Sequence, residues 1–412
     1  MPGRAGTDES AKWRGAWLLL PLAVVLVGLI RRAPRAIERL LLYQDLGSAI
    51  DLRIRFGEAL RWWQGDPIYA TDAHAVYPPF SYLFFRLMIG SDDFTVARFL
   101  WAMEFLAALL VATWLAVRHS GARSWPERLC VALLPLALEA TWRGVVNGQF
   151  TVVPVVAAVG ACVLATRRQP TWPTDLLAAC LFALAVAKPT IGAPFYWVLL
   201  FVPGRFRPGL LALPILGALT LVAAIPQDAG VAELVARWLA RAIDGASQGA
   251  IHGGNANAQT LLGTQGFALA GPLVALGLLG GFGAWASGRA GALLWPMLGV
   301  AGIAARLSVY HRSYDDVLLF PAFVALARGC LGADGEPLWM RRVSGGVLAI
   351  LAALMVTDPL WFLDGALIPT EVVLPAVWLV TLLWLVVQTE RDWRTRVRPR
   401  EGRGTAPGPG TA

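Results

Sequence analysis

The sequence predicts an all-α membrane protein, a polytopic bundle of about 12 transmembrane helices. Hydrophobic residues make up 57% of the 412 residues and charged residues only 15%, whereas an average soluble domain has about 25% charged residues. Apolar runs recur from Trp13 to Gln388, separated by short polar or basic segments. We therefore expect a single transmembrane domain over residues 1–390 and a basic, disordered tail over residues 391–412.

The apolar runs are the candidate spans. A helix that crosses a bilayer alone needs roughly 17 to 25 residues, and several runs, notably the two that flank Lys188-Pro189, are shorter. We expect these to be paired half-helices inside the bundle, because irregular backbone at membrane depth is tolerated only where protein or a water-filled cavity covers it. The runs are Trp13–Ile30, Phe94–Val117, Leu129–Trp142, Phe150–Thr166, Asp175–Ala187, Thr190–Val202, Gly209–Ile225, Gln265–Ala286, Ala290–Ala305, Asp316–Arg328, Val343–Val356 and Glu371–Gln388.

The arginines predict how the bundle is oriented. Lys and Arg in short loops favour the cytoplasmic side, and the tail after Gln388 is strongly basic. The sequence thus predicts a multi-pass membrane protein with both termini in the cytoplasm. Counting spans back from the tail places the other basic turns on that side too, at Arg341-Arg342, Arg289, Arg205 and Arg207, Arg167-Arg168, and Arg118, Arg123 and Arg128.

One basic segment conflicts with this count, because Arg31, Arg32, Arg35 and Arg39 directly follow the first span and fall outside. Either the first span is misplaced, or these residues form an interfacial segment that meets anionic headgroups. The basic turns and the basic tail that orient the bundle account for the net charge of +8. We expect the lipid bilayer as a partner and no nucleic acid, since the sequence contains no nucleic-acid-binding motif.

Polar motifs gather on the side predicted to be extracytoplasmic. Ionisable and amide side chains are costly near a membrane and mark functional sites when they converge on one face. Their convergence predicts an active or binding site there. The motifs are Asp51, Asn147–Phe150 ("NGQF"), Ala187–Thr190 ("AKPT"), Ile251–Thr260 ("IHGGNANAQT") and Tyr310–Asp316 ("YHRSYDD").

Asp51 precedes a segment with helical hydrophobic spacing in the predicted first external loop, residues 31–93. Its apolar residues form one stripe, which predicts an amphipathic interfacial helix from Leu52 to Gln64; the stripe consists of Leu52, Phe56, Leu60 and Trp63. Asp51 would occupy the N-cap of this helix. It either only caps the helix or also acts as a catalytic carboxylate, and Asp315, Glu139 and Glu104 are the next candidate acids.

Lys188 is one of only two lysines in the chain and lies between two apolar half-helices. It either snorkels to the interface or meets an anion such as phosphate. His311 and Arg312 offer further donors for a phosphate at the same boundary. The remaining candidates for substrate binding are Tyr77, Asn147, Gln149, His252, Asn255, Asn257, Tyr314 and Asp315.

Five segments occur in an order that resembles a known family: "DLRIRFGEALRWWQGDPIY", "YPPF", "NGQF", "KPT" and "YHRSYDDVLLFP", over Asp51 to Pro321. Together they resemble the polyprenol-phosphate-mannose-dependent α-mannosyltransferases, which are GT-C glycosyltransferases. The resemblance covers about two thirds of the chain. It implies a GT-C type bundle that transfers a sugar from a lipid-linked phosphosugar on the outer face, with Asp51 as the base.

The residue types agree with this chemistry. A lipid phosphate leaves as a stable anion, so the enzyme needs mainly a carboxylate to accept a proton and cations to hold the phosphate. The sequence has no Asp-x-Asp motif and no Gly-rich phosphate loop, so we expect no nucleotide-sugar donor. No metal-ligating residue and no cofactor is predicted. In-line attack with one base predicts inversion at the sugar, and the acceptor would be a glycan or glycolipid hydroxyl.

Two other classes remain open. A transporter or flippase for a lipid or anion would use Lys188 and the broken helices as an outward-facing cationic site. A non-catalytic scaffold subunit would explain the hydrophobicity but not the clustered polar residues. Sugar transfer from a synthetic polyprenol phosphate separates the three classes.

Overall fold

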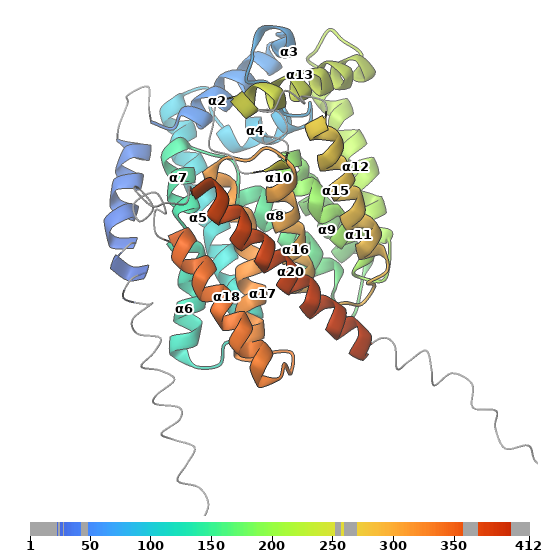
Figure 1. Ribbon diagram of the computed structural model, residues 1–412. Helices are drawn as coiled ribbons and strands as arrows, with labels where there is room; N and C mark the ends of the chain where they lie inside the picture. The colour runs from blue at the N-terminus through green and yellow to red at the C-terminus, as the bar shows by residue number, and fades with distance from the viewer. Residues whose placement is uncertain are drawn as a thin grey trace, which may run out of the picture.

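The computed structural model describes residues 23, 25–27, 29–42, 48–251, 257–258, 270–356 and 370–396. Within these residues all regular secondary structure is helical and no strand occurs (Figure 1). The helices are α2 (Ile50–Trp63), α3 (Ile68–Thr71), α4 (Ser81–Ile89), α5 (Phe94–His119), α6 (Trp125–Ala137), α7 (Glu139–Asn147), α8 (Val152–Ala165), α9 (Trp172–Val186), α10 (Pro189–Gly192), α11 (Tyr196–Phe201), α12 (Arg207–Ala224), α13 (Val231–Ile251), α15 (Ala270–Ser287), α16 (Leu294–Ser308), α17 (Phe320–Leu331), α18 (Leu338–Val356) and α20 (Thr370–Arg396), with 3-10 turns η1 (Ala193–Phe195) and η2 (Ser313–Leu319).

The predicted polytopic helical membrane bundle is confirmed. By length and composition, four described helices can cross a membrane, namely α5, α12, α18 and α20, and the pair α6–α7, bent by 41°, makes up to five. Five shorter apolar helices complete the bundle. Within the described residues, the predicted runs from Phe94 onward coincide with helices, whereas most of the run Trp13–Ile30 lies outside them.

The chain breaks between two apolar helices at Lys188, as the short runs predicted. Helix α9 ends at Val186, and α10, η1 and α11 continue from Pro189 in three short pieces. Ile191 and Phe195 on these pieces are fully buried, so protein covers the irregular backbone. This burial agrees with the requirement that backbone polar groups be satisfied inside a membrane protein.

The arginine-rich segment that conflicted with the predicted topology is helical. Residues 29–41 form a continuous helix, with Ala36 and Leu40 buried against the bundle. Arg32 lies 3.1 Å from a carboxylate oxygen of Glu139 on α7. These contacts make the segment part of the folded bundle.

A cap of short helices covers one end of the bundle. Helices α2, α3, α4 and α13 lie across that end (Figure 1). Their shared core is a cluster that includes Trp62, Tyr69, Tyr82 and Phe85. The indole of Trp62 stacks on Tyr82 with a ring separation of 4.6 Å and donates a hydrogen bond to the carbonyl oxygen of Ala223 at 2.8 Å. This contact joins the cap to α12 in the bundle.

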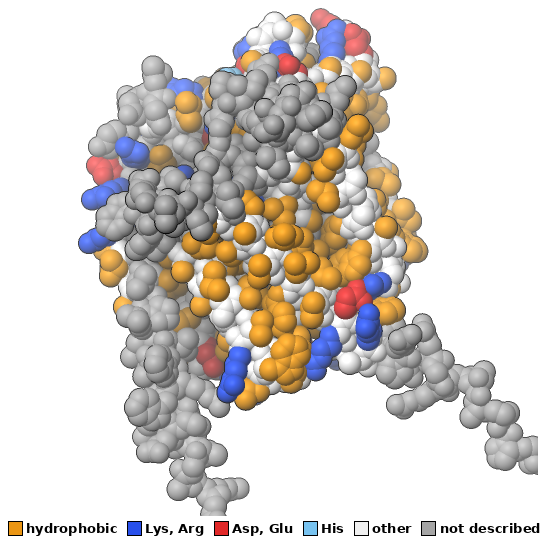
Figure 2. Space-filling model, viewed as in Figure 1, with side chains coloured by type: hydrophobic (Ala, Val, Ile, Leu, Met, Phe, Trp, Pro, Cys, Tyr) orange, Lys and Arg blue, Asp and Glu red, His pale blue; other side chains and the backbone are white. Residues whose placement is uncertain are grey.

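The two ends of the bundle differ in charge arrangement. Lys188 lies two residues beyond the end of α9. At the other end of this helix, Asp175 in its first turn pairs with Arg205 and Arg207. Helix α17 likewise has Asp315 before its start and Arg328 in its last turn. Hydrophobic side chains cover much of the surface between the ends (Figure 2). The polar motifs and the basic turns therefore lie at opposite ends.

The end of the last helix differs from the expected domain boundary. We expected the tail to begin at residue 391, but α20 continues to Arg396. Trp393 packs against the main hydrophobic core, and Arg289 lies over its ring at 4.9 Å. Residues 397–412 lie outside the described chain.

Candidate functional site

Asp51 lies in the first turn of α2 and does not cap it, so the expected N-cap role is wrong. The N-cap is Ala49, whose φ of 50° and ψ of 39° place it in the left-handed region, and no side chain caps the helix. The backbone N–H of Ala49 donates to the carbonyl oxygen of Val146 at 2.9 Å. The helix start is thus fixed by α7, which leaves the Asp51 carboxylate available for other contacts.

Gly148 allows α2 and the end of α7 to meet. It ends α7 in the left-handed conformation with φ of 64°. A Cβ atom at this position would lie 2.5 Å from the Cβ of Leu52, so any larger residue would push α2 away. The glycine of "NGQF" therefore has a steric role in placing Asp51 next to the following Gln149.

The Gln149 side chain binds the Asp51 carboxylate directly. Its Nε2 donates to Asp51 Oδ2 at 3.1 Å, while its Oε1 accepts a hydrogen bond from the backbone N–H of Phe150 at 2.9 Å. That second contact fixes which end of the amide faces Asp51. Gln149 is buried and Asp51 is half-buried, so Gln149 orients a carboxylate that remains partly accessible.

Lys188 forms a buried ion pair with Asp315. Its Nζ lies 2.6 Å from Asp315 Oδ1 and also donates to Thr151 Oγ1 at 2.9 Å. The Thr151 hydroxyl in turn donates to Asp315 Oδ1 at 2.8 Å. The three residues come from the break after α9, the start of α8 and the turn η2, and their contacts join these segments.

Gly302 lets η2 approach α16 closely enough for this arrangement. A Cβ atom at Gly302 would collide with the carbonyl oxygen of Leu318. The other Asp315 oxygen, Oδ2, accepts a hydrogen bond from the backbone N–H of Arg312 at 3.1 Å. Asp315 is therefore held by both its oxygens.

His311 and Arg312 are neighbours in sequence but differ in exposure. His311 is fully buried behind Asp315, with its Nδ1 3.5 Å from Asp315 Oδ2, and burial lowers its pKa. A buried, uncharged imidazole is not open to a donor phosphate and carries no positive charge for it, so the expected contact between His311 and the phosphate does not fit this position. Arg312 is exposed, and its Nε donates to the Tyr310 hydroxyl at 2.7 Å.

The environments of Asp51 and Asp315 shift their pKa values in opposite directions. Burial raises the pKa of Asp51 above its ordinary value, against the opposing effect of Arg55, Lys188 and Arg312. Burial alone would raise the pKa of Asp315 as well, but the Lys188 ammonium and His311 lower it. Asp315 therefore stays ionised as the partner of Lys188, while Asp51 is the more basic carboxylate.

Tyr77 and Arg55 form the boundary of the site on the cap side. The Arg55 guanidinium lies over the Tyr77 ring at 4.7 Å and pairs with Glu58 at 2.5 Å. Burial raises the pKa of Glu58 to about 7, although Arg55 opposes this shift. Tyr314, also buried, has Lys188 5.5 Å from its ring centre.

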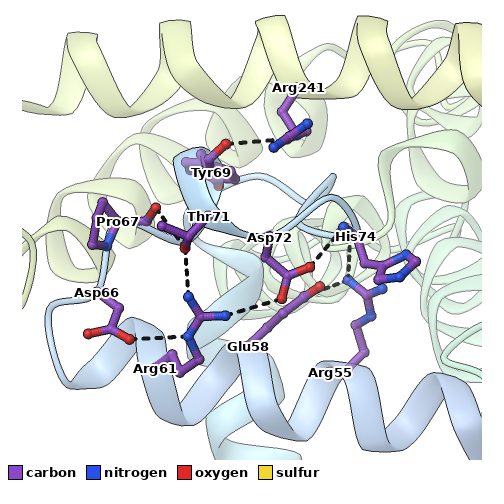
Figure 3. A network of polar contacts seen from close by, with 10 residues as sticks. All are labelled: Arg55, Glu58, Arg61, Asp66, Pro67, Tyr69, Thr71, Asp72, His74 and Arg241. Carbon is purple, nitrogen blue, oxygen red and sulfur yellow. Dashed lines mark hydrogen bonds and ion pairs between the residues drawn. The ribbon is translucent and has the colours of Figure 1, made fainter.

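The polar residues from Arg55 to His74 mainly stabilise the segment that contains them (Figure 3). Arg61 reaches Asp66 at 3.1 Å, Asp72 at 3.3 Å and Thr71 at 2.6 Å, which holds the segment after α2 against that helix. Above it, Arg241 of α13 donates to the Tyr69 carbonyl oxygen at 3.2 Å. Asp51 takes no part in this network, so its carboxylate has a separate role.

The remaining residues predicted for substrate binding or as the base differ in where the structure places them. Asn147 is the half-buried last residue of α7, and Asn257 is buried. His252 and Asn255 lie outside the described residues. Glu139, a fallback candidate for the base, is held in ion pairs with Arg32 and Arg143, so two cations already engage its carboxylate.

Sequence reasoning missed Thr151, the Arg55–Glu58 pair and helix α13. Thr151 directly follows "NGQF", so a hydroxyl next to that motif was the available signal. Arg55 and Glu58 are three residues apart on a predicted helix, a spacing that favours ion pairs. The strong amphipathic pattern from Val231 would have identified α13.

The fold and the polar site define a membrane-embedded enzyme with a carboxylate and cations at one end of its bundle. A family model described as glycosyltransferase family 87 matches residues 75–327, more than half of the chain. The chain therefore belongs to glycosyltransferase family 87 and is a membrane glycosyltransferase. The matched range contains Gln149, Lys188 and Asp315 but begins after Asp51. Comparisons with curated proteins and with solved structures gave no match.

Proposed function

We propose that this glycosyltransferase transfers a hexose, with mannose as the expected sugar, from a polyprenol-phosphate-sugar to a hydroxyl of a glycan or glycolipid. Asp51 is the base that accepts the proton of the acceptor hydroxyl. The attack is in line with the departing phosphate and inverts the anomeric carbon. The family membership of the chain supports glycosyl transfer, and the sequence resemblance supports the lipid-linked donor.

The contrast between Asp51 and Asp315 is the observation that carries the assignment of the base. A general base needs a free, reasonably basic carboxylate within reach of substrate. Asp315 is buried, paired with Lys188 and made less basic by it. Asp51 is half-buried, contacts the neutral Gln149 amide and is made more basic by burial. Two carboxylates whose pKa values are shifted apart commonly divide such roles.

Arg312 is the main cation for the donor phosphate in this proposal. It is exposed and forms no ion pair within the described chain. Its positive charge is close enough to Asp51 to lower the pKa of that carboxyl, against the effect of burial. Lys188 contributes less directly, because two of its three ammonium protons are used by Thr151 and Asp315. Arginine also fits phosphate geometry better, since its planar guanidinium can form two parallel hydrogen bonds.

The reaction takes place on the extracytoplasmic face of the plasma membrane in this proposal. Its support is the separation of charges along the bundle: Arg205, Arg207 and Arg328 lie at the end opposite Lys188 and Asp315. Basic residues favour the cytoplasmic side. Cysteine labelling at Ser313 tests the orientation, because an exposed external residue reacts with an impermeant reagent in intact cells.

Asp51→Asn provides the central test. With purified protein, we expect transfer of labelled mannose from synthetic polyprenol-phosphate-mannose to octyl glycosides to fall by about 10² to 10⁴ fold, the usual contribution of general acid–base catalysis. Donor binding, measured separately by calorimetry, should remain. Asp66→Asn is the matched control, since Asp66 lies in the same loop but belongs to the Arg61 network. Near-normal transfer by Asp51→Asn would show that the base lies elsewhere.

The same assay addresses the transporter alternative. A transporter would move the lipid or anion without releasing a glycoside product. The buried pairing of Lys188 with Asp315 removes the free cation on which that alternative depended. No labelled product with any lipid-phosphate sugar, despite demonstrable binding, would contradict the proposed enzyme.

A further inference from the structure

A polar cavity lies at the end of the bundle opposite Asp51. Its volume is about 270 Å³, and it lies between the start of α16, the turn after α17 and the last turns of α20. Ligand pockets commonly have about 300 to 1,000 Å³, so this cavity is large enough for a headgroup but not for a lipid-linked glycan. Its polar lining consists of Asp334, Glu336, Gln388, Arg391, Asp392 and Thr395.

Gln388 has a hydrogen-bond acceptor that the described protein leaves unused. The residue is only 6% exposed and lines the cavity. Its Nε2 donates to Ser344 Oγ at 2.8 Å, which orients the amide, while its Oε1 accepts no hydrogen bond from any residue that the structure describes. A buried unsatisfied acceptor is costly, so a ligand that donates a hydrogen bond there is favoured.

Arg391 provides an available positive charge beside this acceptor. Its guanidinium contacts the thioether sulfur of Met340, a weak acceptor, and forms no ion pair with a carboxylate in the described part of the chain. Asp334, by contrast, is already paired with Arg328 at 2.6 Å. An incoming phosphate would give Arg391 the charged partner that it lacks.

Glu336 supplies the opposite charge. Its Oε2 accepts a hydrogen bond from the backbone N–H of Asp334 at 3.1 Å, and its side chain lines the cavity. Partial burial raises its pKa, an effect that a bound ammonium group would counter. Beside the paired Asp334, the lining thus offers one cation, Arg391, the carboxylates of Glu336 and Asp392, and the carboxamide acceptor of Gln388. One cation beside carboxylates and an amide oxygen matches a phosphate ester that carries a nearby ammonium group.

Apolar surface continues from the cavity along the bundle. Leu338 and Trp339, on α18 next to the cavity, are 60% and 56% exposed, and Leu383 and Val387 on α20 are 57% and 48% exposed. Hydrophobic side chains cover the face formed by these two helices (Figure 2). In a membrane protein such a surface contacts acyl chains, so a ligand seated in the cavity can be the headgroup of a lipid.

We propose that this cavity binds the headgroup of a phosphatidylethanolamine molecule, with its phosphate on Arg391 and its ammonium group between Glu336 and the Gln388 carboxamide oxygen. The acyl chains lie along α18 and α20. This lipid site is separate from the proposed transfer site and does not depend on the reaction assigned to it.

Lipid titration of the purified full-length protein, read by native mass spectrometry, tests the proposal. We expect dioleoyl phosphatidylethanolamine to bind more tightly than dioleoyl phosphatidylcholine, whose methylated ammonium cannot donate to Gln388. Arg391→Gln should weaken phosphatidylethanolamine binding by about tenfold or more, the effect of losing a charge-assisted hydrogen bond. Arg394→Gln, an exposed position on the same helix outside the cavity, should bind as the unmodified protein does.

Two further arms keep the test decisive. Thr395→Trp, which fills the cavity without removing a charge, should also displace the lipid, so a folding defect of Arg391→Gln alone does not decide the result. Free phosphoethanolamine should bind far more weakly than the lipid. Equal lipid binding by Arg391→Gln and Arg394→Gln, equal affinity for the two lipids, or binding of free phosphoethanolamine only would each overturn the proposal.

Discussion

Lys188 and Asp315 form an ion pair of 2.6 Å although 127 residues separate them in the chain. Both side chains are buried, at 8% and 6% exposure. The pair joins the break between α9 and α10 to the turn before α17, and so it holds the two segments that border Asp51. A lysine that appeared in the sequence to be an anion site is therefore first a structural partner.

Breaking this pair should destabilise the protein. Lys188→Met leaves the Asp315 charge buried without a partner, which typically costs about 3 to 5 kcal/mol, whereas replacing both partners by apolar residues is often nearly neutral. We expect the thermal midpoint of the purified protein to fall in Lys188→Met and to recover in Lys188→Met/Asp315→Leu.

The donor KM of the double variant separates the two roles of Lys188. If Lys188 also contacts the donor phosphate, stability returns while the KM stays high. A normal KM in the restored double variant would limit Lys188 to its structural role. An unaltered midpoint in Lys188→Met would contradict the importance of the pair itself.

Arg312→Gln should affect donor binding more than folding. Arg312 is exposed, and its side chain donates a hydrogen bond to the Tyr310 hydroxyl. Loss of a charge-assisted hydrogen bond to phosphate corresponds to about 10 to 100 fold in kcat/KM, expressed mainly in the KM for the donor. Arg237→Gln, at an exposed position on α13, is the control and should leave kinetics unchanged. An equal KM for both variants would remove Arg312 from the donor site.

The pH dependence of kcat/KM should report the Asp51 carboxylate. A base acts when deprotonated, so activity is lost as pH falls through its pKa. Because burial raises the pKa of Asp51, the acid limb should have its midpoint above about 3.9, the ordinary value for Asp. A profile that stays flat down to the ordinary value would argue against the assignment.

Glu58 is the necessary control for that profile, because its pKa is raised to about 7. Its removal by Glu58→Gln should leave the acid limb in place if Asp51 is the titrating base. Because the folded-state pKa of Glu58 is raised from 4.5 to about 7, the protein loses stability as pH rises through this range, the opposite of a carboxylate whose pKa is lowered on folding. Disappearance of the acid limb in Glu58→Gln would assign the titration to Glu58.

Gly148→Ala should separate α2 from α7. The new Cβ would lie 2.5 Å from the Leu52 Cβ, and the position has a φ of 64°, so the variant is strained on both counts. We expect a lower thermal midpoint together with reduced transfer, because Asp51 and Gln149 move apart. Gly57→Ala is matched to it, since a Cβ there meets nothing within 4 Å and alanine favours the helix. Similar behaviour of the two variants would contradict the steric role of Gly148.

The sequence by itself determined the class of structure. Apolar runs and their helical spacing depend on residues that are near one another in the chain, and burial in a bilayer makes such runs helical. The runs at α5, α12 and α20 and the helix after Asp51 were predictable for this reason. The polar motifs at one end could also be grouped, because counting spans fixes the end to which each loop belongs.

Only the tertiary structure decided which of these polar residues contact one another. Asp51 meets Gln149 across 98 residues, and Asp315 rather than Asp51 takes the charge of Lys188. The sequence contains several acids and cations near the same boundary, and which of them pair depends on distances of a few ångströms that residue spacing does not determine. The N-cap assignment of Asp51 failed for the same reason, since contact with Val146 sets the helix start. The role of each carboxylate follows from its neighbours in space, because burial and nearby charge, more than residue type, set its pKa.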